Sequence, residues 1–289
     1  MGGEAGANDT YEVSLGDEHL EPPPNSILRE RTKEPKSFDQ TFEIDMPPTA
    51  KQQSWGAKDT SRVVVMLGVC LMSVCFWAVY EQMGNTLALY AERNVDRSIT
   101  LGGKVLCSFP PEYVQSINPI FILTFTPFVN SLWRWQSRRG NEPKPLTKMA
   151  IGCFLLSLGY GLLAFVEVVA SASDSKQAEA PADGRTPVPH KVSFIWLILS
   201  IVLSTIGELY FSPVGLSFIS SIAPASITSL ALGCWMLSSF GGNYLAGHLG
   251  ALFPYMNLSS FFTMLASIAL GNSIALALVS RPLSRRLAL

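Results

Sequence analysis

Long apolar segments alternate with short polar loops along this chain of 289 residues. A helix needs about 20 mainly apolar residues to cross the hydrocarbon core of a bilayer. Six segments reach about this length, so the pattern predicts six transmembrane helices, the first of which continues as helix to Glu92. The predicted spans cover residues of about 63–80, 117–135, 149–170, 192–222, 227–253 and 258–279.

The first 60 residues have a different pattern. They are polar, carry charges of both signs and contain six prolines. Such a composition buries too little apolar surface to fold. We therefore expect a disordered cytoplasmic tail over 1–60, a six-helix transmembrane domain over 61–280 and a short basic cytoplasmic tail over 281–289. The longest loop, 171–191, shows no periodicity and is expected to be irregular.

The distribution of basic residues predicts the orientation of the helices. Cytoplasmic loops of membrane proteins carry an excess of Lys and Arg. If the N-terminal tail lies in the cytoplasm, that side holds 15 of the 21 basic residues and the other side holds 6. Both termini are therefore expected to be cytoplasmic, and the sequence leaves open whether the membrane is the plasma membrane or an internal one.

Composition supports an integral membrane protein and excludes several other classes. The chain is 48% hydrophobic and 15% charged, whereas a typical soluble domain is about 25% charged. A net charge of −1 argues against nucleic-acid binding, which needs a basic surface. The five cysteines and three histidines lack the clustered spacing of a metal site.

Catalytic motifs are also missing from the sequence. It contains no HExxH, GxSxG or Walker pattern, each of which would carry a recognisable mechanism. We expect no metal, no organic cofactor and no enzymatic activity. A membrane enzyme or receptor would require a catalytic cluster that these residues do not form.

Two carboxylates lie in the apolar segments, where a charged side chain is energetically unfavourable. Glu208 lies within the fourth segment and Glu81 ends the first. A charged side chain costs roughly 2.5–3.5 kcal/mol in a membrane span, so such residues usually face a cavity, a partner or an ion path. Glu208 is either a structural carboxylate bonded to a neighbouring helix or a site for a proton or an amine. Glu81 either marks an interfacial helix end or joins Trp77, one turn earlier, in a cavity wall.

Further residues in the spans allow two interpretations each. Asn118 is either the cap of a helix that begins with Pro119 or a side chain that lines a cavity. Pro127 and Pro213 interrupt helix regularity, which membrane helices use to bend around a cavity. Trp235 either packs or lines a path, and small residues near it allow close helix contacts.

In their order, these segments resemble the C-terminal half of the proton-coupled oligopeptide transporters, the POT family of the major facilitator superfamily. The resemblance covers about residues 60–280 and depends on motifs that follow one another in the expected order. The matching strings are FWAVYEQ (76–82), AER (91–93), INPIFI (117–122), KMAIG (148–152), GEL (207–209), SPVGLS (212–217), AP (223–224), GCW (233–235) and GNYLAG (242–247).

The resemblance implies an all-α integral membrane fold, with six helices equivalent to helices 7–12 of a twelve-helix carrier. It implies roles for particular side chains. Glu208 would bind the amino group of a short peptide and Asn118 would assist it. Trp77, Trp235 and Ser239 would line side-chain pockets. Glu81 and Glu208 would couple transport to protons, and Pro127 and Pro213 would allow helix bending and gating.

The function implied by the resemblance is proton-coupled import of di- and tripeptides, with H⁺ as the coupling ion. Substrate binds between the two halves of such carriers, and a single half provides one wall of the cavity. We therefore expect the chain to be a fragment, or to need an N-terminal half or a second copy, and not to transport alone. The alternative is a non-transporting membrane protein that keeps the half-fold as a regulator or pairing partner.

Overall fold

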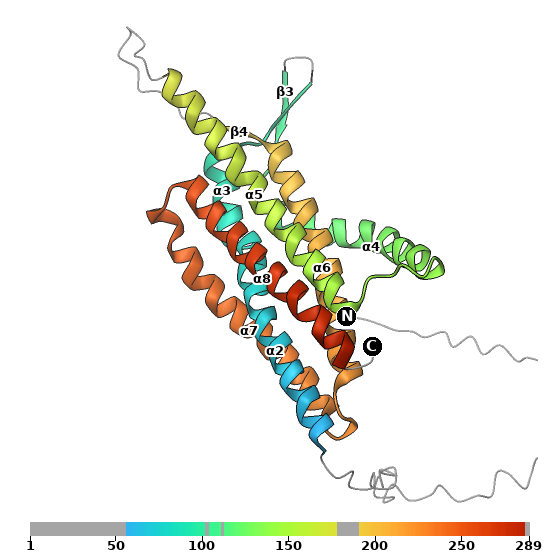
Figure 1. Cartoon of the computed structure of the whole chain (residues 1–289). Coiled ribbons are helices and arrows are strands. Elements are labelled where there is room, and N and C mark those ends of the chain that lie inside the picture. The colour runs from blue at the N-terminus through green and yellow to red at the C-terminus, as the bar shows by residue number, and fades with distance from the viewer. Residues whose placement is uncertain (1–55, 102–103, 111–112, 178–190, 287–289) are drawn as a thin grey trace, which may run out of the picture. The chain divides into compact units, whose positions relative to one another are not determined.

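The computed structural model describes residues 56–101, 104–110, 113–177 and 191–286 (Figure 1). All six predicted spans coincide with helices. The predicted tail up to residue 55 lies outside the described residues, and α2 begins at Ala57. The helices are α2 (Ala57–Tyr80), α3 (Thr86–Asn94), α4 (Val114–Arg138), α5 (Pro145–Gln177), α6 (Phe194–Ile222), α7 (Thr228–Ala251) and α8 (Leu258–Arg286).

The first span continues as helix, as predicted. One turn of 3-10 helix, η1 (Glu81–Met83), lies between α2 and α3. A candidate membrane span of 36 residues, from Asp59 to Asn94, runs through these three elements. Two further short turns, η3 (Ala225–Ile227) and η4 (Phe253–Tyr255), flank α7.

Four helical segments of the described chain are long and apolar enough to cross a membrane on length and composition alone. The helices α4 and α7 are not among these four, because polar residues lower their mean hydropathy. These residues include Asn118 and Asn130 in α4 and Asn243 in α7. Polar side chains are costly against lipid. Their number in these two helices indicates surfaces that face a cavity or another helix.

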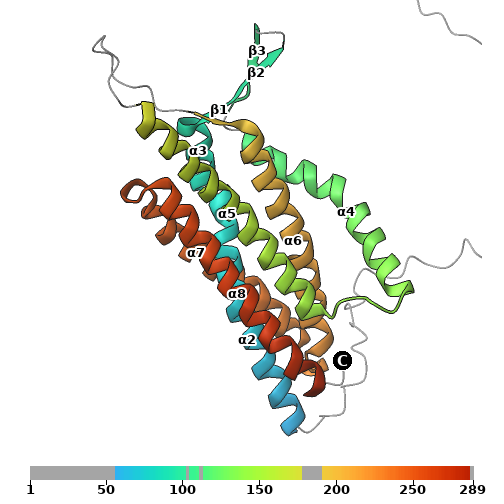
Figure 2. The ribbon, with the colours of Figure 1, turned by 45° about the horizontal axis from the view of Figure 1, so that its top comes forward.

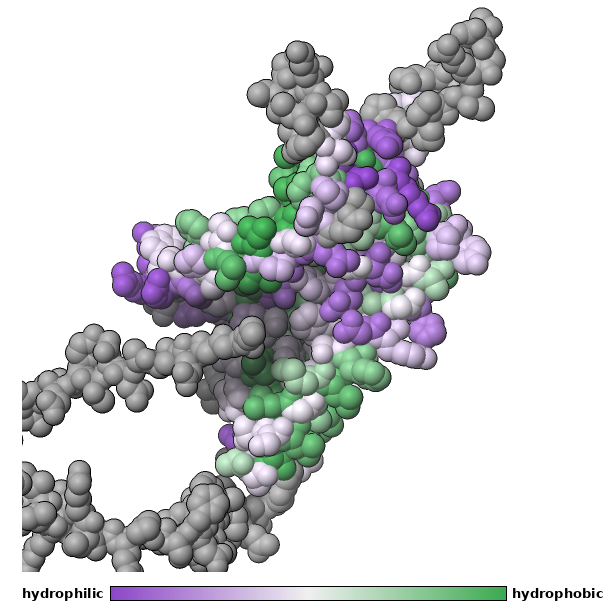
Figure 3. Space-filling view, turned by 180° about the vertical axis from the view of Figure 1, so that it is seen from behind, coloured by the Kyte–Doolittle hydropathy of each residue, from purple (hydrophilic) through white to green (hydrophobic). Residues whose placement is uncertain are grey.

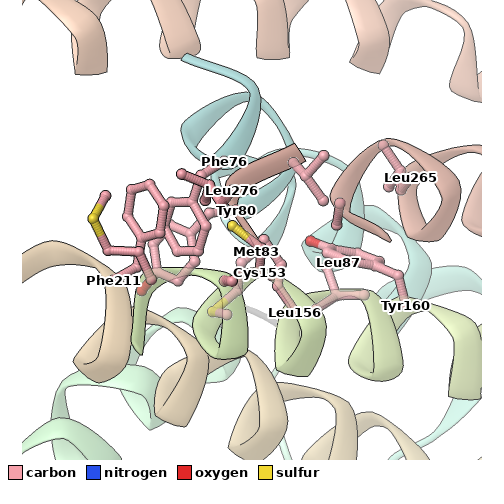
Figure 4. Close-up of a cluster of buried hydrophobic side chains, with 14 of the residues drawn as sticks. Phe76, Tyr80, Met83, Leu87, Cys153, Leu156, Tyr160, Phe211, Leu265 and Leu276 are labelled. Carbon is pink, nitrogen blue, oxygen red and sulfur yellow. The ribbon is translucent and has the colours of Figure 1, made fainter. Parts of the chain in front are cut away.

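The order in which the helices pack is shown in Figures 1 and 2, where α5 lies between α6 and α8, and α2 lies along α7. The core of this arrangement is aromatic and aliphatic (Figure 4). The rings of Phe76 and Phe211 stack with centroids 3.8 Å apart and join α2 to α6. Phe76, Tyr80, Met83 and Leu87 recur every three or four residues, a spacing that places them on one helix face.

A close backbone contact joins α5 to α6 just before Glu208. A methyl group added to Gly207 would lie 2.7 Å from the carbonyl oxygen of Gly152, and one added to Gly152 would lie 2.6 Å from that of Gly207. Small residues allow such close approach between membrane helices. The contact fixes the height of Glu208 on α6 relative to α5.

Short strands connect the helices at one end, and the sequence pattern did not predict them. β1 (Val95–Asp96) pairs in parallel with β4 (Val192–Ser193), so the chain after α3 is fastened to the start of α6. β2 (Ser98–Leu101) and β3 (Lys104–Ser108) form an antiparallel hairpin. Two-residue pairings leave too little alternation for a periodicity argument.

The expected irregular loop begins later than residue 171, because α5 continues to Gln177. Residues 171–177 contain neither proline nor glycine, the two residues that most strongly end a helix. The rest of that predicted loop, 178–190, lies outside the described residues.

The helix α4 leans away from the other helices in both views and packs mainly against α6 (Figures 1 and 2). Only Val114 and Val129 are buried on it. Large apolar side chains on its other faces are exposed, including Ile120, Leu123 and Phe128. From behind, Figure 3 shows hydrophobic patches next to hydrophilic ones on the surface of the molecule. Such a surface suits contact with lipid or with other helices.

Candidate functional site

A polar network inside the membrane spans joins three helices around Glu208. The Tyr80 hydroxyl at the end of α2 donates a hydrogen bond to the Glu208 carboxylate on α6. Asn118 Nδ2 on α4 donates to the same hydroxyl at 2.7 Å. The Thr205 hydroxyl lies 2.6 Å from Asn118 Oδ1 and 2.7 Å from the carbonyl oxygen of Ile201. Each polar group therefore finds a partner on another helix, as buried polar groups require.

The position of Asn118 decides between its two interpretations. Since α4 begins at Val114, Asn118 and Pro119 lie inside the helix and Asn118 is not its cap. Its side chain reaches across to α2 and α6 instead. A side chain amide offers both donors and an acceptor, which is why one residue can bridge a tyrosine and a threonine.

Sequence reasoning did not select Tyr80 and Thr205 as site residues, although signals for both were present. Tyr80 immediately precedes Glu81 and lies one turn after Phe76. Thr205 precedes Glu208 by three residues, a spacing that places both on one face of α6. Polar residues three or four positions from an intramembrane carboxylate share its helix face and are therefore candidate site residues.

A cavity of about 370 Å³ adjoins Glu208 between α4 and α6. Ligand pockets commonly measure about 300–1,000 Å³, so this cavity is large enough for a small group of a ligand. Its wall combines the carboxylate with few polar and several apolar side chains. The lining residues are Ile122, Thr126, Val129, Asn130, Trp133, Glu208, Leu209, Ser212 and Pro213.

The two prolines selected from the sequence lie in helices that continue past them. Pro213 is inside α6 and contributes to the cavity wall. Pro127 is inside α4, is exposed and is not among the residues that line this cavity. A proline in a helix interior removes one backbone hydrogen bond, so both helices have a weak point near the site. Their role in gating remains a prediction.

Trp77 lies beside the network. Its ring meets the Tyr80 ring edge to face, with centroids 5.6 Å apart. Within the described part of the chain, its buried Nε1 has no hydrogen-bond partner. The indole therefore retains a free donor near the tyrosine that binds Glu208.

The structure does not bring Trp235 and Ser239 into this network. Trp235 is 3% exposed, and its ring packs on Phe211 and over Gly215. The Ser239 hydroxyl donates to the carbonyl oxygen of Met236 at 2.8 Å, within its own helix. Their assignment as substrate-binding residues stays a prediction.

Glu81 is the first residue of η1 and is half-buried, one residue after Tyr80. Among the described residues its carboxylate makes no ion pair and no side-chain hydrogen bond. No group of three or more metal-ligating side chains gathers in that same part of the chain. The chemistry that the site offers is hydrogen bonding, charge pairing and proton exchange at two carboxylates.

A family model described as PTR2, POT family, matches residues 31–271 of this chain. The chain belongs to the POT family. The match begins at residue 31, before the resemblance seen in the sequence motifs, which starts at about residue 60. The family is one of transporters, so membership also confirms the membrane fold and agrees at a coarse level with the expectation that the chain is not an enzyme.

Several curated POT relatives align with most of the chain. It is 30% identical over 220 residues to the uncharacterized transporter YclF of Bacillus subtilis (strain 168), covering 75% of this chain and 40% of that protein. It is 27% identical over 222 residues to the peptide transporter YePEPT of Yersinia enterocolitica, covering 77% of this chain and 40% of that protein. The dipeptide and tripeptide permease A of Salmonella typhi is 29% identical over 227 residues, covering 75% of this chain and 40% of that protein.

Solved POT structures share the fold. A POT family transporter in complex with a thioalcohol-conjugated peptide superposes with a TM-score of 0.67 at 25% identity, covering 80% of this chain and 44% of that chain. A peptide transporter POT in complex with sulfate superposes with a TM-score of 0.66 at 26% identity, covering 81% of this chain and 43% of that chain. The chain thus spans about two fifths of the length of the relatives that it matches. The all-α, multi-pass membrane fold expected from the sequence is confirmed.

Proposed function

We propose that this POT chain forms the C-terminal half of a proton-coupled importer of di- and tripeptides, in which Glu208 binds the amino group of the peptide. One observation carries the proposal: Glu208 lies within a membrane span, on a cavity wall, held by a hydroxyl from another helix. The names of the peptide-transporting relatives support the substrate class.

The chemistry of the site supports proton coupling. An unpaired carboxylate is costly in a membrane span, so Glu208 is expected to hold a proton while no cation is near. The ammonium group of a peptide supplies the missing charge. The carboxylic acid of Glu208 then gives its proton to water, and the resulting carboxylate pairs with the ammonium group. Tyr80 and Asn118 hold the carboxylate in place while this exchange occurs. Glu81, half-buried and without an ion-pair partner among the described residues, serves as the second proton-coupling group and holds the proton that is imported together with the peptide.

The proposal also includes the side-chain pockets and the part of the cavity that this chain does not form. Trp77, Trp235 and Ser239 contribute to side-chain pockets, and both termini lie in the cytoplasm, on the side with more basic residues. A second wall, from an N-terminal six-helix half or a second copy of this chain, completes the cavity, since substrate binds between two halves in such carriers. The proposal includes H⁺ as the coupling ion and no cofactor.

Peptide binding tests the proposal without requiring the second wall. The purified chain in nanodiscs is expected to bind dialanine at least about 10-fold more tightly than N-acetyl-dialanine, because acetylation removes the ammonium charge that Glu208 pairs with. The measurement is displacement of radiolabelled dialanine by each compound. Equal displacement by both would refute amine recognition, and no binding of dialanine by folded protein would refute peptide binding by this chain alone.

A further inference from the structure

A second cavity adjoins the one that contains Glu208. It measures about 370 Å³ and is lined by Asn130, Trp133, Arg134, Ser137 and Glu142, at the end of α4 and in the loop that follows. Asn130 and Trp133 line both cavities. The indole of Trp133 therefore forms part of the boundary between the space beside Glu208 and the end of α4.

Two neighbouring side chains fix the ring of Trp133. Tyr210 on α6 meets it edge to face, with centroids 5.3 Å apart. The ammonium group of Lys148 on α5 lies 4.2 Å from the ring centroid. A cation placed over an indole face is attracted by its electron density. The ring is thus held from α5 and α6, although it belongs to α4.

Lys148 is itself held in position. It is 7% exposed, and its Nζ lies 2.6 Å from Glu142 Oε1 in the loop between α4 and α5. The hydrogen bond from Lys148 lowers the pKa of Glu142, which favours the carboxylate that pairs with the ammonium group. A buried ammonium group needs such a partner. Glu142 therefore fixes Lys148, and Lys148 fixes the ring.

Hydrogen bonding by the indole does not contribute to this arrangement. Trp133 Nε1 is buried, and it has no partner in the part of the chain that the structure describes. The orientation of the ring then depends on Tyr210 and Lys148. A change at either residue is expected to loosen the indole without breaking a hydrogen bond of its own.

We propose that Trp133 closes the cavity beside Glu208 at the end of α4 and limits the size of the substrate side chain that this cavity accepts, and that Lys148 and Glu142 are positioning residues for its ring. The inference about substrate size rests on the proposed function, because it takes the ligand of Glu208 to be a short peptide. The closing role of the ring rests on the geometry alone.

Chemical labelling tests the closing role without a peptide. In Ser212→Cys, a thiol replaces a hydroxyl group in the wall of the cavity beside Glu208. The rate of labelling by fluorescein maleimide, divided by that by N-ethylmaleimide, is measured by mass spectrometry of the peptide that carries position 212. Adding Trp133→Ala is expected to raise this ratio at least about 10-fold. Adding Lys148→Met is expected to raise it by a smaller factor, and Lys148→Arg should preserve it because the cation remains.

Trp135→Ala is the matched control. Trp135 is also on α4 and is also paired with a cation, Arg139, at 4.0 Å, but it is 50% exposed and lines neither cavity. It should leave the labelling ratio unchanged. An unchanged ratio in Trp133→Ala, or an equal rise in Trp135→Ala, would overturn the closing role.

Competition binding tests the size limit. The affinity for alanyl-phenylalanine relative to dialanine is expected to rise at least about 10-fold in Trp133→Ala and to stay constant in Trp135→Ala. An unchanged preference, with dialanine still bound, would overturn the size limit. If neither protein binds dialanine while the labelling ratio rises, the proposed function fails and the closing role stands.

Discussion

Replacement of Glu208 by glutamine is expected to weaken dialanine binding by about 100-fold, or about 2.8 kcal/mol. The amide keeps the shape of the side chain and can still accept the hydrogen bond from Tyr80, but it provides no charge for the ammonium group. Loss of one partner from a desolvated charge pair costs about 2–5 kcal/mol. Binding of radiolabelled dialanine to the chain in nanodiscs measures the change.

Glu92→Gln is the matched control for this prediction. Glu92 is an exposed carboxylate on α3 and lines neither cavity beside α4. It is expected to bind dialanine like the unmodified chain. A loss of similar size in both variants would show that general charge, rather than the position of Glu208, governs affinity.

Gly207→Val is expected to destabilise the protein by about 3 kcal/mol, at the upper end of typical overpacking costs. The new side chain would begin 2.7 Å from the carbonyl oxygen of Gly152 and 3.3 Å from the backbone nitrogen of Leu156. Backbone atoms cannot move aside as the end of a flexible side chain can. The helices α5 and α6 would have to separate, and Glu208 would move with α6.

The free energy of unfolding in detergent, measured by denaturant titration, tests this prediction. Gly271→Val is the control, since nothing lies within 4 Å of a methyl group added at Gly271 in the middle of α8. Gly271→Val has the same free-energy cost of placing valine in a helix, but it produces no steric clash. Equal unfolding free energies for the two variants would show that the contact between Gly152 and Gly207 does not constrain the packing.

Much of the fold could be predicted because the bilayer imposes a length on apolar helices. All six predicted spans coincide with helices, and four helical segments of the described chain are long and apolar enough to cross a membrane. The β1 and β4 strands could not be found, because their two-residue pairing depends on contacts between distant loops. The position of α5's end was missed because polarity, which suggested a loop after Ala170, does not itself end a helix.

The site was partly predictable for a different reason. Glu208 and Asn118 stood out because polar groups are costly where apolar residues surround them. Thr205 did not, since a threonine hydroxyl in a helix can bond to its own backbone, as it does to Ile201, and carries no comparable penalty. Tyr80 did not, since most of its side chain is an apolar ring. The burial of Trp235 over Gly215 and the pairing of Trp133 with Lys148 arise from packing between helices, which no local pattern specifies.

The most direct test of amine binding at Glu208, the central claim of the proposed function, is the number of protons released when dialanine binds. Calorimetric titration of the chain in nanodiscs, repeated in buffers with different ionisation enthalpies, gives this number. About one proton per peptide is expected near neutral pH, and none in any residual binding by Glu208→Gln. The same proton release in both proteins, or peptide binding without proton release in the unmodified chain, would contradict the account.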